Sequence, residues 1–288
     1  MILLLAMPAL LLMGLVFGWP MLRYSWLSFH ADSVITGLVP VPNGGANWIR
    51  LMEDQRFWQD VVQTTRFAGV SVGVELVLAL AIALLLDQRW RGRGVVRALA
   101  LLPWALPTTM MALGWRWIFN TPYGPIERLA HTLGFESLNL LSTPQSTWIV
   151  TALADVWKTT PFITLLLLAG LQTIPEDLYS AFRLEGGRPL QALGRITLPL
   201  LLPYILISLL FRGAQAFGVF DLIQVLTGGG PAGSTESLAL YAFMNAMRFL
   251  DFGYSATVMV AGFLLLTSAM LAVAVLLRFT GLLRPVQS

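Results

Sequence analysis

The sequence predicts an all-α integral membrane protein with six transmembrane helices. Of its 288 residues, 57% are hydrophobic and only 11% are charged, and its mean hydropathy is +0.74. Soluble domains contain roughly 25% charged residues, so a water-soluble fold of this composition would expose large apolar patches. The chain has no cysteine, and its two histidines, His30 and His131, lie far apart. We therefore expect no disulfide and no metal site.

Six stretches are long enough to cross a hydrocarbon core of about 30 Å, which takes roughly 20 apolar residues. The first lacks the basic leader and the small-residue cleavage site of a signal peptide, so we expect it to be a retained helix. The expected spans are residues 2–27, 62–86, 98–118, 147–172, 198–220 and 256–279. Because there is no soluble domain and no clear internal repeat, we expect residues 1–288 to form a single transmembrane domain.

The placement of basic residues predicts the orientation, because arginine and lysine accumulate in cytoplasmic loops. One side of the predicted topology carries nine of them: Arg89, Arg91, Arg93, Arg97, Arg183, Arg188, Arg195, Arg278 and Arg284. The other side carries four: Arg50, Arg56, Arg128 and Arg248. We therefore expect the first side to be cytoplasmic, together with both chain termini.

Sequence motifs of enzymes are missing. The chain contains no G-x-x-x-x-G-K-[ST] phosphate-binding loop, no H-E-x-x-H and no G-x-S-x-G. We therefore expect that the chain is not an enzyme and binds no cofactor itself.

Charged side chains inside the spans are informative, because each is costly in lipid and usually faces a cavity or a partner. Asp155 and Lys158 are three residues apart in the fourth span, so they can form an ion pair. Asp155, Thr159 and Phe162 also follow a helical repeat. A carboxylate, a hydroxyl and an aromatic ring on one stripe suit a sugar, and core packing explains the stripe equally well. Arg66 and Arg116 are expected to extend towards the membrane interface.

A second polar and aromatic cluster lies at the end of the fifth span. It comprises Arg212, Gln215, Phe217, Phe220 and Asp221. Gly213 and Gly218 permit close approach of another helix. Contact between helices and contact with a ligand both remain open for this cluster.

Residues 173–197 predict two short helices outside the lipid. Thr173 and Glu176 fit a capping box, which predicts a helix from about residue 174. Gly186 and Gly187 end that helix, because helices commonly end on a left-handed glycine, and Pro189 begins the next one. An ordinary connection needs about 2–8 residues. A connection of about 25 residues is expected to contact a partner.

This segment resembles the E-A-A-x3-G-x9-I-x-L-P loop of ABC importer permeases, which docks on the ATPase subunit. The leading glutamate is replaced by Ser180 and the second alanine by Phe182, whereas Glu185 keeps the acidic position before the glycine. The resemblance implies a coupling helix, and its positions are Ser180, Ala181, Phe182, Glu185, Gly186, Ile196, Leu198 and Pro199.

The segments "LLPWALPTTMMALGWRWIFN", "DVWKTTPF" and "LTGGGPAGSTESLALYAF" also resemble the larger permease of maltose importers. The resemblance covers roughly residues 2–280. It implies a type I ABC importer permease in the bacterial cytoplasmic (inner) membrane. Its partners would be a second permease in a heterodimer, two ATP-binding subunits that hold ATP and Mg, and an extracytoplasmic sugar-binding protein, with no nucleic acid.

The resemblance carries over sugar contacts to Asp155, Thr159, Phe162, Phe217 and Gly218. With their neighbours, the expected substrate-binding residues are Asp155, Lys158, Thr159, Phe162, Phe217, Gly218 and Asp221. A neutral disaccharide such as maltose or trehalose is the expected substrate. Lys158 or Arg212 could instead hold a phosphate, as in glycerol-phosphate importers of the same family. A transporter driven by an ion gradient is the other alternative.

Overall fold

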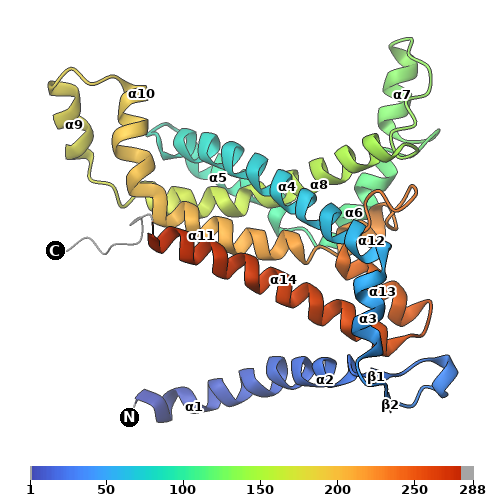
Figure 1. The fold of residues 1–288 in the computed structure, drawn as a ribbon. Helices are drawn as coiled ribbons and strands as arrows, with labels where there is room; N and C mark the ends of the chain where they lie inside the picture. The colour runs from blue at the N-terminus through green and yellow to red at the C-terminus, as the bar shows by residue number, and fades with distance from the viewer. Residues whose placement is uncertain (1, 280–288) are drawn as a thin grey trace. The chain divides into compact units, whose positions relative to one another are not determined.

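The computed structural model describes residues 2–279, which are mostly helical (Figure 1). The first elements are α1 (Ile2–Met13), η1 (Gly14–Gly18), α2 (Trp19–Leu27), β1 (His30–Ala31), η2 (Val34–Thr36), β2 (Val41–Pro42), α3 (Ala46–Glu53), α4 (Gln55–Asp87), α5 (Arg93–Ala105) and α6 (Thr108–Ile118). They are followed by α7 (Pro125–Thr132), α8 (Pro144–Leu171), α9 (Glu176–Leu184), α10 (Pro189–Ala192), η3 (Leu193–Thr197), α11 (Leu198–Phe217), α12 (Asp221–Leu226), α13 (Leu238–Met247) and α14 (Phe252–Phe279). Arg284, which the orientation argument counts, lies outside the described residues.

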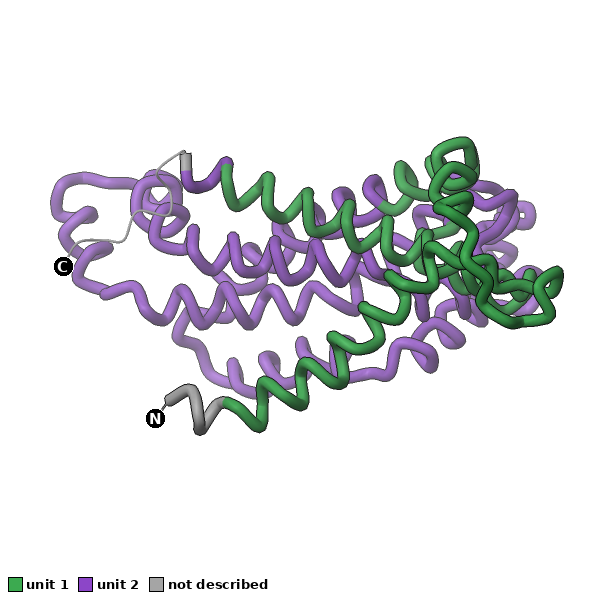
Figure 2. The backbone as a smooth tube through the Cα atoms, turned by 60° about the horizontal axis from the view of Figure 1, so that its bottom comes forward, with its two compact units in different colours: residues 1–64, 236–275 green, residues 65–235, 276–288 purple. Residues whose placement is uncertain are grey.

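The chain divides into two compact units (Figure 2). Unit 1 contains residues 1–64 and 236–275, and unit 2 contains residues 65–235 and 276–288. Both predicted sites lie in unit 2. The prediction of one domain over the whole chain stays a prediction.

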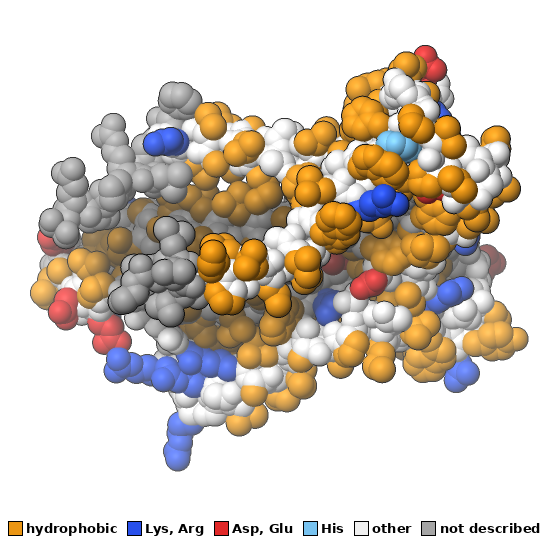
Figure 3. All heavy atoms as spheres, turned by 90° about the horizontal axis from the view of Figure 1, so that it is seen from below, with side chains coloured by type: hydrophobic (Ala, Val, Ile, Leu, Met, Phe, Trp, Pro, Cys, Tyr) orange, Lys and Arg blue, Asp and Glu red, His pale blue; other side chains and the backbone are white. Residues whose placement is uncertain are grey.

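Five helical segments of the described residues are long and apolar enough to cross a membrane. They are Met7–Leu27, Gln55–Asp87, Pro144–Leu171, Pro189–Phe217 and Phe252–Arg278. A sixth crossing requires α5 and α6 to act together, although they are bent by 90° relative to each other. Hydrophobic side chains cover much of the face in Figure 3, as expected for a surface in contact with lipid.

The expected span over residues 98–118 is therefore broken into two helices. α5 ends at Ala105 and α6 begins at Thr108, with Leu106 extended at ψ 136°. Pro107 explains the break, because proline has no N–H to donate and its ring pushes the preceding residue out of the helical conformation.

Two further spans are longer than predicted. α4 has 33 residues, which is about 50 Å at 1.5 Å per residue, whereas the hydrocarbon core is about 30 Å thick. Its first turns therefore extend beyond the lipid. The fifth span includes α10 and η3 before α11, so the helical segment runs from Pro189 rather than from residue 198.

The core of unit 2 lies where α4, α8 and α11 meet. Ala79 and Ala83 of α4 pack with Ile163 and Leu167 of α8 and Leu201 of α11. A second cluster joins α6, α8 and α12 around Met111, Val150 and Leu222. In Figure 1, α9 and α10 lie at one end of α8 and α11, and α7 lies at the other end.

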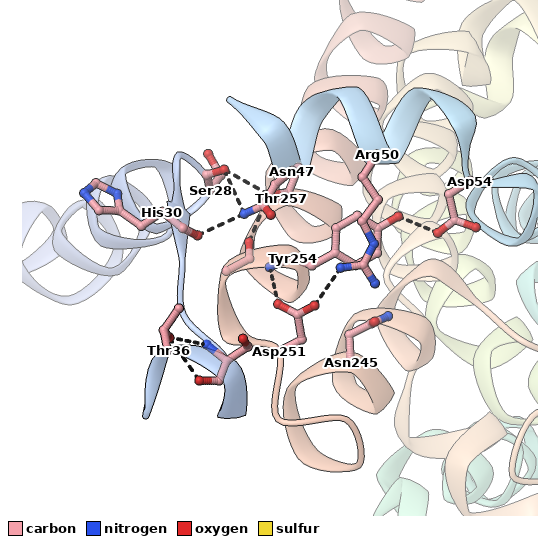
Figure 4. Close-up of polar contacts among 12 residues, drawn as sticks. Ser28, His30, Thr36, Asn47, Arg50, Asp54, Asn245, Asp251, Tyr254 and Thr257 are labelled. Atoms are coloured by element: carbon pink, nitrogen blue, oxygen red, sulfur yellow. Dashed lines mark hydrogen bonds and ion pairs between the residues drawn. The ribbon is translucent and has the colours of Figure 1, made fainter. Parts of the chain in front are cut away.

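Unit 1 is joined by polar contacts between segments far apart in sequence (Figure 4). The Asn47 side-chain amide donates to the carbonyl oxygens of Ser28 and His30, at 3.3 and 3.0 Å. Arg50 forms an ion pair of 2.7 Å with Asp251. These contacts attach α3 to the end of α2 and to the start of α14.

Candidate functional sites

Unit 2 contains a cavity of about 310 Å³ between α5, α6, α8, α11 and α12. Its wall carries one indole ring together with hydroxyl, amide and charged groups. Small-molecule sites commonly occupy about 300–1,000 Å³ and combine apolar walls with a few polar groups. The polar side chains of the wall, apart from Asp155, are Thr108, Lys158, Thr159, Arg212, Gln215 and Asp221.

Glu75, Asp155 and Arg212 form a buried charge cluster against this cavity, and each comes from a different helix. Arg212 Nε donates to Glu75 Oε2 at 2.8 Å, and its Nη2 donates to Glu75 Oε1 at 3.0 Å and to Asp155 Oδ2. The side chains of Arg212, Glu75 and Asp155 are 3%, 0% and 8% exposed. The cluster therefore joins α4, α8 and α11 by charge-assisted hydrogen bonds.

Thr159 adds a hydroxyl to the same cluster. Its Oγ1 lies 2.7 Å from Glu75 Oε1 and 2.6 Å from the carbonyl oxygen of Asp155. The carboxylate and hydroxyl of the predicted sugar-binding stripe thus line the cavity and already have hydrogen-bond partners within the protein.

Lys158 binds to the backbone at the break between α5 and α6. Its Nζ donates to the carbonyl oxygen of Leu106 at 2.8 Å and to that of Trp104 at 3.4 Å. These are carbonyls at the C-terminal end of α5, where a positive charge is favourable. The ion pair that the spacing of Asp155 and Lys158 allows is not formed, because the Asp155 carboxylate pairs with Arg212.

An aromatic stack includes one residue of the cavity wall, Trp104. The rings of Trp104 and Phe162 are stacked, with centroids 5.8 Å apart and an interplanar angle of 23°. Phe162 also contacts Phe211, with ring centroids 5.3 Å apart. Trp104 lines the cavity, whereas Phe162 does not.

The structure brings five of the seven predicted substrate-binding residues to one cavity: Asp155, Lys158, Thr159, Gly218 and Asp221. Phe162 and Phe217 are not among the lining residues. Sequence reasoning missed Glu75, Trp104 and Thr108. Glu75 could have been recognised from the sequence, because a lone carboxylate within an apolar span needs a partner.

The segment after α8 forms the predicted elbow of two short helices. Gly186 follows α9 with a φ of +81°, which is the left-handed conformation expected after a helix. A Cβ atom on Gly187 would lie 2.1 Å from the ring of Phe182, so the close packing of this ring requires glycine. The hydroxyls of Tyr179 and Thr197 are 3.0 Å apart and join α9 to η3.

The predicted capping box at the start of α9 is wrong. Pro175 is the N-cap, and no side chain caps the helix. The Thr173 hydroxyl instead donates to the carbonyl oxygen of Gly170 at 2.7 Å, at the end of α8. Glu176 forms an exposed ion pair with Arg89 at 2.6 Å.

The outer face of the elbow is apolar and open to contact. Leu184 is 90% exposed and Leu190 is 83% exposed. Ser180 accepts a hydrogen bond of 3.2 Å from Arg183. The predicted coupling positions divide into the exposed Ser180, Ala181, Glu185, Gly186 and Pro199, and the partly buried Phe182, Ile196 and Leu198.

Residues 75–281 match the family model described as the binding-protein-dependent transport system inner membrane component. The chain is 42% identical over 250 residues to the trehalose/maltose transport system permease protein MalF of Thermococcus litoralis, covering 86% of this chain and 84% of that protein. It is 36% identical over 275 residues to the sulfoquinovosyl glycerol transport system permease protein SmoG of Agrobacterium fabrum, covering 96% of this chain and 88% of that protein.

The fold is similar to a chain in the crystal structure of a bacterial alginate ABC transporter in complex with an alginate pentasaccharide-bound periplasmic protein. The TM-score is 0.83, with 96% of this chain and 93% of that chain covered. Because the sequence identity is 17%, this likeness concerns the fold alone.

Proposed function

The chain belongs to the family of inner-membrane components of binding-protein-dependent transport systems and is a permease of a sugar ABC importer, and we propose that it imports a neutral disaccharide of the maltose or trehalose type. It is a multi-pass membrane protein and a transporter subunit rather than an enzyme. We propose that import is driven by ATP rather than by an ion gradient.

The observation that supports a neutral substrate is that both cations of the cavity are engaged within the protein. Arg212 uses Nε and Nη2 in hydrogen bonds to Glu75 and Asp155. Lys158 donates to two backbone carbonyls at the bend of the third span. The cavity wall carries two cationic side chains, Lys158 and Arg212, and two carboxylates, Asp155 and Asp221, so it offers no excess positive charge to a phosphate. The similarity to a trehalose/maltose permease points the same way.

Uptake by the reconstituted importer tests the substrate. Proteoliposomes containing this permease, its partner permease and the ATPase subunits are supplied with the binding protein and with radiolabelled trehalose, maltose or glycerol 3-phosphate. We expect ATP-dependent uptake of a disaccharide and none of glycerol 3-phosphate. Uptake of glycerol 3-phosphate, abolished by Lys158→Met, would overturn the proposal in favour of the phosphate alternative.

We also propose that α9 and the turn after it couple the permease to an ATPase subunit. Leu184, the last residue of α9, and Leu190, in the first turn of α10, are both exposed apolar side chains, and exposed apolar surfaces typically bind a partner. The fixed turn at Gly186 and Gly187 and the Tyr179–Thr197 contact support a rigid elbow that transmits movement to α11. Ser180 replaces the leading glutamate of the family motif, but Leu184 and Leu190 still supply the apolar part of the proposed contact with the ATPase subunit.

Co-purification tests this coupling. Leu184→Asp places a charge on a side chain that is 90% exposed, so it costs the fold little and is expected to abolish both recovery of the ATPase subunit and sugar uptake. Leu133→Asp is the matched control, because Leu133 follows α7 and is 65% exposed. Normal recovery of the ATPase with Leu184→Asp would remove α9 from the interface.

The proposed assembly contains a second, different permease, two ATPase subunits and an extracytoplasmic binding protein, and both termini of this chain are cytoplasmic. The absence of cysteine allows a direct test with single thiols. In intact cells, a membrane-impermeant thiol reagent should label a Glu136→Cys variant and spare a Ser180→Cys variant. The opposite pattern would invert the orientation.

A further inference from the structure

Unit 2 also contains a larger cavity, of about 770 Å³, between the end of α4, the start of α5, the end of α8 and the start of α9. None of the predicted coupling or substrate-binding residues, which all lie within residues 2–279, lines it. The loop between α4 and α5 lies at the same end of unit 2 as α9 (Figure 1), and the ion pair of Arg89 with Glu176 joins the two. The charged lining residues are three arginines and two carboxylates, which gives a net positive charge: Asp87, Arg89, Arg93, Arg97 and Glu176.

Arg93 and Arg97 carry the positive charge that remains in this cavity. Arg89 is paired with Glu176. Within residues 2–279, neither Arg93 nor Arg97 takes part in an ion pair. Arg97 Nη2 donates to the carbonyl oxygen of Leu86 at 2.7 Å, but its buried Nε has no hydrogen-bond partner among the described residues, although buried donors are nearly always paired. Because Arg93 and Arg97 are four residues apart on α5, they share one face of the helix and can hold one anion together.

The cavity lies where the spans end. The spanning segment of α4 ends at Asp87 and that of α8 ends at Leu171, and both residues are in the cavity wall. The head groups of a bilayer begin where its hydrocarbon core ends. Trp90, in the loop between α4 and α5, is 38% exposed, and tryptophan is enriched at this interface. The two arginines are therefore at the depth of the lipid phosphates.

An apolar crevice begins at the same arginine. Arg97 lines both the cavity and a crevice of about 30 Å³, whose apolar lining residues include Ile82 and Leu86 of α4 and Leu165 and Leu168 of α8. Leu165 is 38% exposed, so part of this apolar wall is open at the surface of the chain. A ligand with both an anionic group and an apolar chain fits this pair of features better than a free phosphate does.

We propose that this cavity binds the head group of an anionic phospholipid, with the phosphate at Arg93 and Arg97 and an acyl chain along the apolar side chains next to Arg97. Arginine is suited to this role because its planar guanidinium donates two parallel hydrogen bonds to phosphate. Basic pockets between the cytoplasmic ends of transmembrane helices are a recurring form of lipid site. The inference does not depend on which sugar the importer carries.

A thiol in the cavity wall tests the site. Gln172→Cys places it at an exposed lining residue, and it is the only thiol of this chain because the natural sequence has none. The assembled importer is reconstituted into liposomes of phosphatidylcholine alone or of one part phosphatidylglycerol to three parts phosphatidylcholine. We expect phosphatidylglycerol to slow modification of the thiol by methyl methanethiosulfonate about fivefold. This reagent is uncharged, so the surface charge of the liposome does not alter its local concentration.

Arginine variants of the same Gln172→Cys chain identify the residues that hold the lipid. Arg93→Gln combined with Arg97→Gln is expected to abolish the protection by phosphatidylglycerol. Arg93→Gln alone should weaken it, and this single change leaves the bond of Arg97 to the backbone of α4 intact. Arg91→Gln combined with Arg188→Gln is the matched control, because it removes the same charge at two exposed arginines outside the cavity wall. This control should keep the full protection.

Two further arms distinguish the source of the phosphate. Inorganic phosphate added to the phosphatidylcholine liposomes should not protect the thiol, because it lacks the acyl chain. A phosphatidylglycerol that carries a photoactivatable diazirine in one acyl chain should label the segment of α8 that contains Leu165 and Leu168, and unlabelled phosphatidylglycerol should compete with it.

Several results would overturn the lipid site. Equal modification rates in both kinds of liposome would mean that another subunit covers the arginines. Loss of protection in the control variant as well would reduce the effect to general surface charge. Protection by inorganic phosphate as strong as that by phosphatidylglycerol would make the cavity a site for a soluble phosphate compound, and absence of labelling on α8 would remove the acyl chain from the crevice.

Discussion

The charge cluster of unit 2 and the polar network of unit 1 use similar groups in different surroundings. In unit 2, Arg212 is enclosed with Glu75 and Asp155, and all three side chains are less than 10% exposed. In unit 1, Arg50 pairs with Asp251 while the two side chains are 54% and 20% exposed. Water screens the second pair and hardly reaches the first. The same ionic contact is therefore expected to matter much more in unit 2.

The exposure of Asp54, in unit 1, lies between that of the buried cluster and that of the Arg50–Asp251 pair (Figure 4). Burial alone raises the pKa of this carboxyl, but hydroxyl hydrogen bonds from Tyr241 and Tyr254 and amide hydrogen bonds from Phe57 and Arg56 outweigh it, so the pKa lies below its ordinary value. Burial and the hydrogen bond to Asp54 raise the pKa of Tyr241 to about 12. Neutral donors thus stabilise the charge of Asp54, whereas a cation stabilises the charges in unit 2.

The largest effect on the free energy of unfolding is expected from Arg212→Met. This change leaves two carboxylates buried without their cation, and breaking a buried ion pair in this way typically costs about 3–5 kcal/mol. SDS-induced unfolding of the purified permease in mixed micelles measures the loss. The triple variant Glu75→Met, Asp155→Leu, Arg212→Met is the control, because replacing the whole cluster by apolar groups should restore most of the stability. A loss below about 1 kcal/mol for Arg212→Met would contradict the role assigned to desolvation.

The spans and the elbow could be predicted from sequence because their signals are local. Apolar length marks the helices, and the paired glycines with Pro189 mark the turn between α9 and α10. The break of the third span was missed although Pro107 was visible, because a proline within an apolar stretch is equally compatible with a kinked but continuous helix. The capping box was predicted wrongly for a similar reason, because the spacing of Thr173 and Glu176 is also compatible with another partner for the hydroxyl. In the structure, the Thr173 hydroxyl donates to the carbonyl oxygen of Gly170.

The cavity could be predicted only in part, because it depends on contacts between helices. The fourth-span stripe indicated Asp155 and Thr159, and both line the cavity. The partner of Arg212 was not predictable by spacing, since Glu75 is 137 positions away in sequence. Lys158 likewise bonds to carbonyls more than fifty positions away, rather than to Asp155, its neighbour in sequence.

The second-largest effect on stability is expected from Tyr254→Phe in unit 1. The hydroxyl donates to Asp54, and Tyr254 is fully buried, so its removal should cost about 1–3 kcal/mol. Because the folded-state pKa of Asp54 is lowered, its stabilisation is present above its ordinary pKa of 3.8 and is lost as pH falls through the folded value. Tyr254→Phe should therefore move acid-induced unfolding to higher pH, as measured by circular dichroism. Tyr123→Phe, at a side chain 70% exposed, is the control.

Glu75→Gln tests the cluster from its acidic side and is expected to have a smaller effect than Tyr254→Phe. The amide keeps the size of the side chain, and the remaining Asp155–Arg212 pair is electrically neutral. We therefore expect a change of less than about 1 kcal/mol in the same SDS titration, because no buried charge is left unpaired. A loss as large as that of Arg212→Met would mean that Glu75 and Arg212 form the essential pair and that Asp155 contributes little.

The smallest effect is expected from Asp251→Asn, which removes the charge opposite Arg50. Exposed ion pairs contribute about 0.2–1 kcal/mol and are screened by salt. Asn can still accept at its side-chain oxygen the hydrogen bond that Asp251 Oδ1 accepts from the Tyr254 amide, at 3.1 Å. Arg50 also keeps its position over the Tyr254 ring, 3.8 Å from the centroid. The difference from wild type should therefore shrink between 50 mM and 1 M salt, whereas the effect of Arg212→Met should not, because salt does not enter a cluster that water hardly reaches. An equal salt dependence of both variants would show that the two regions share one electrostatic environment.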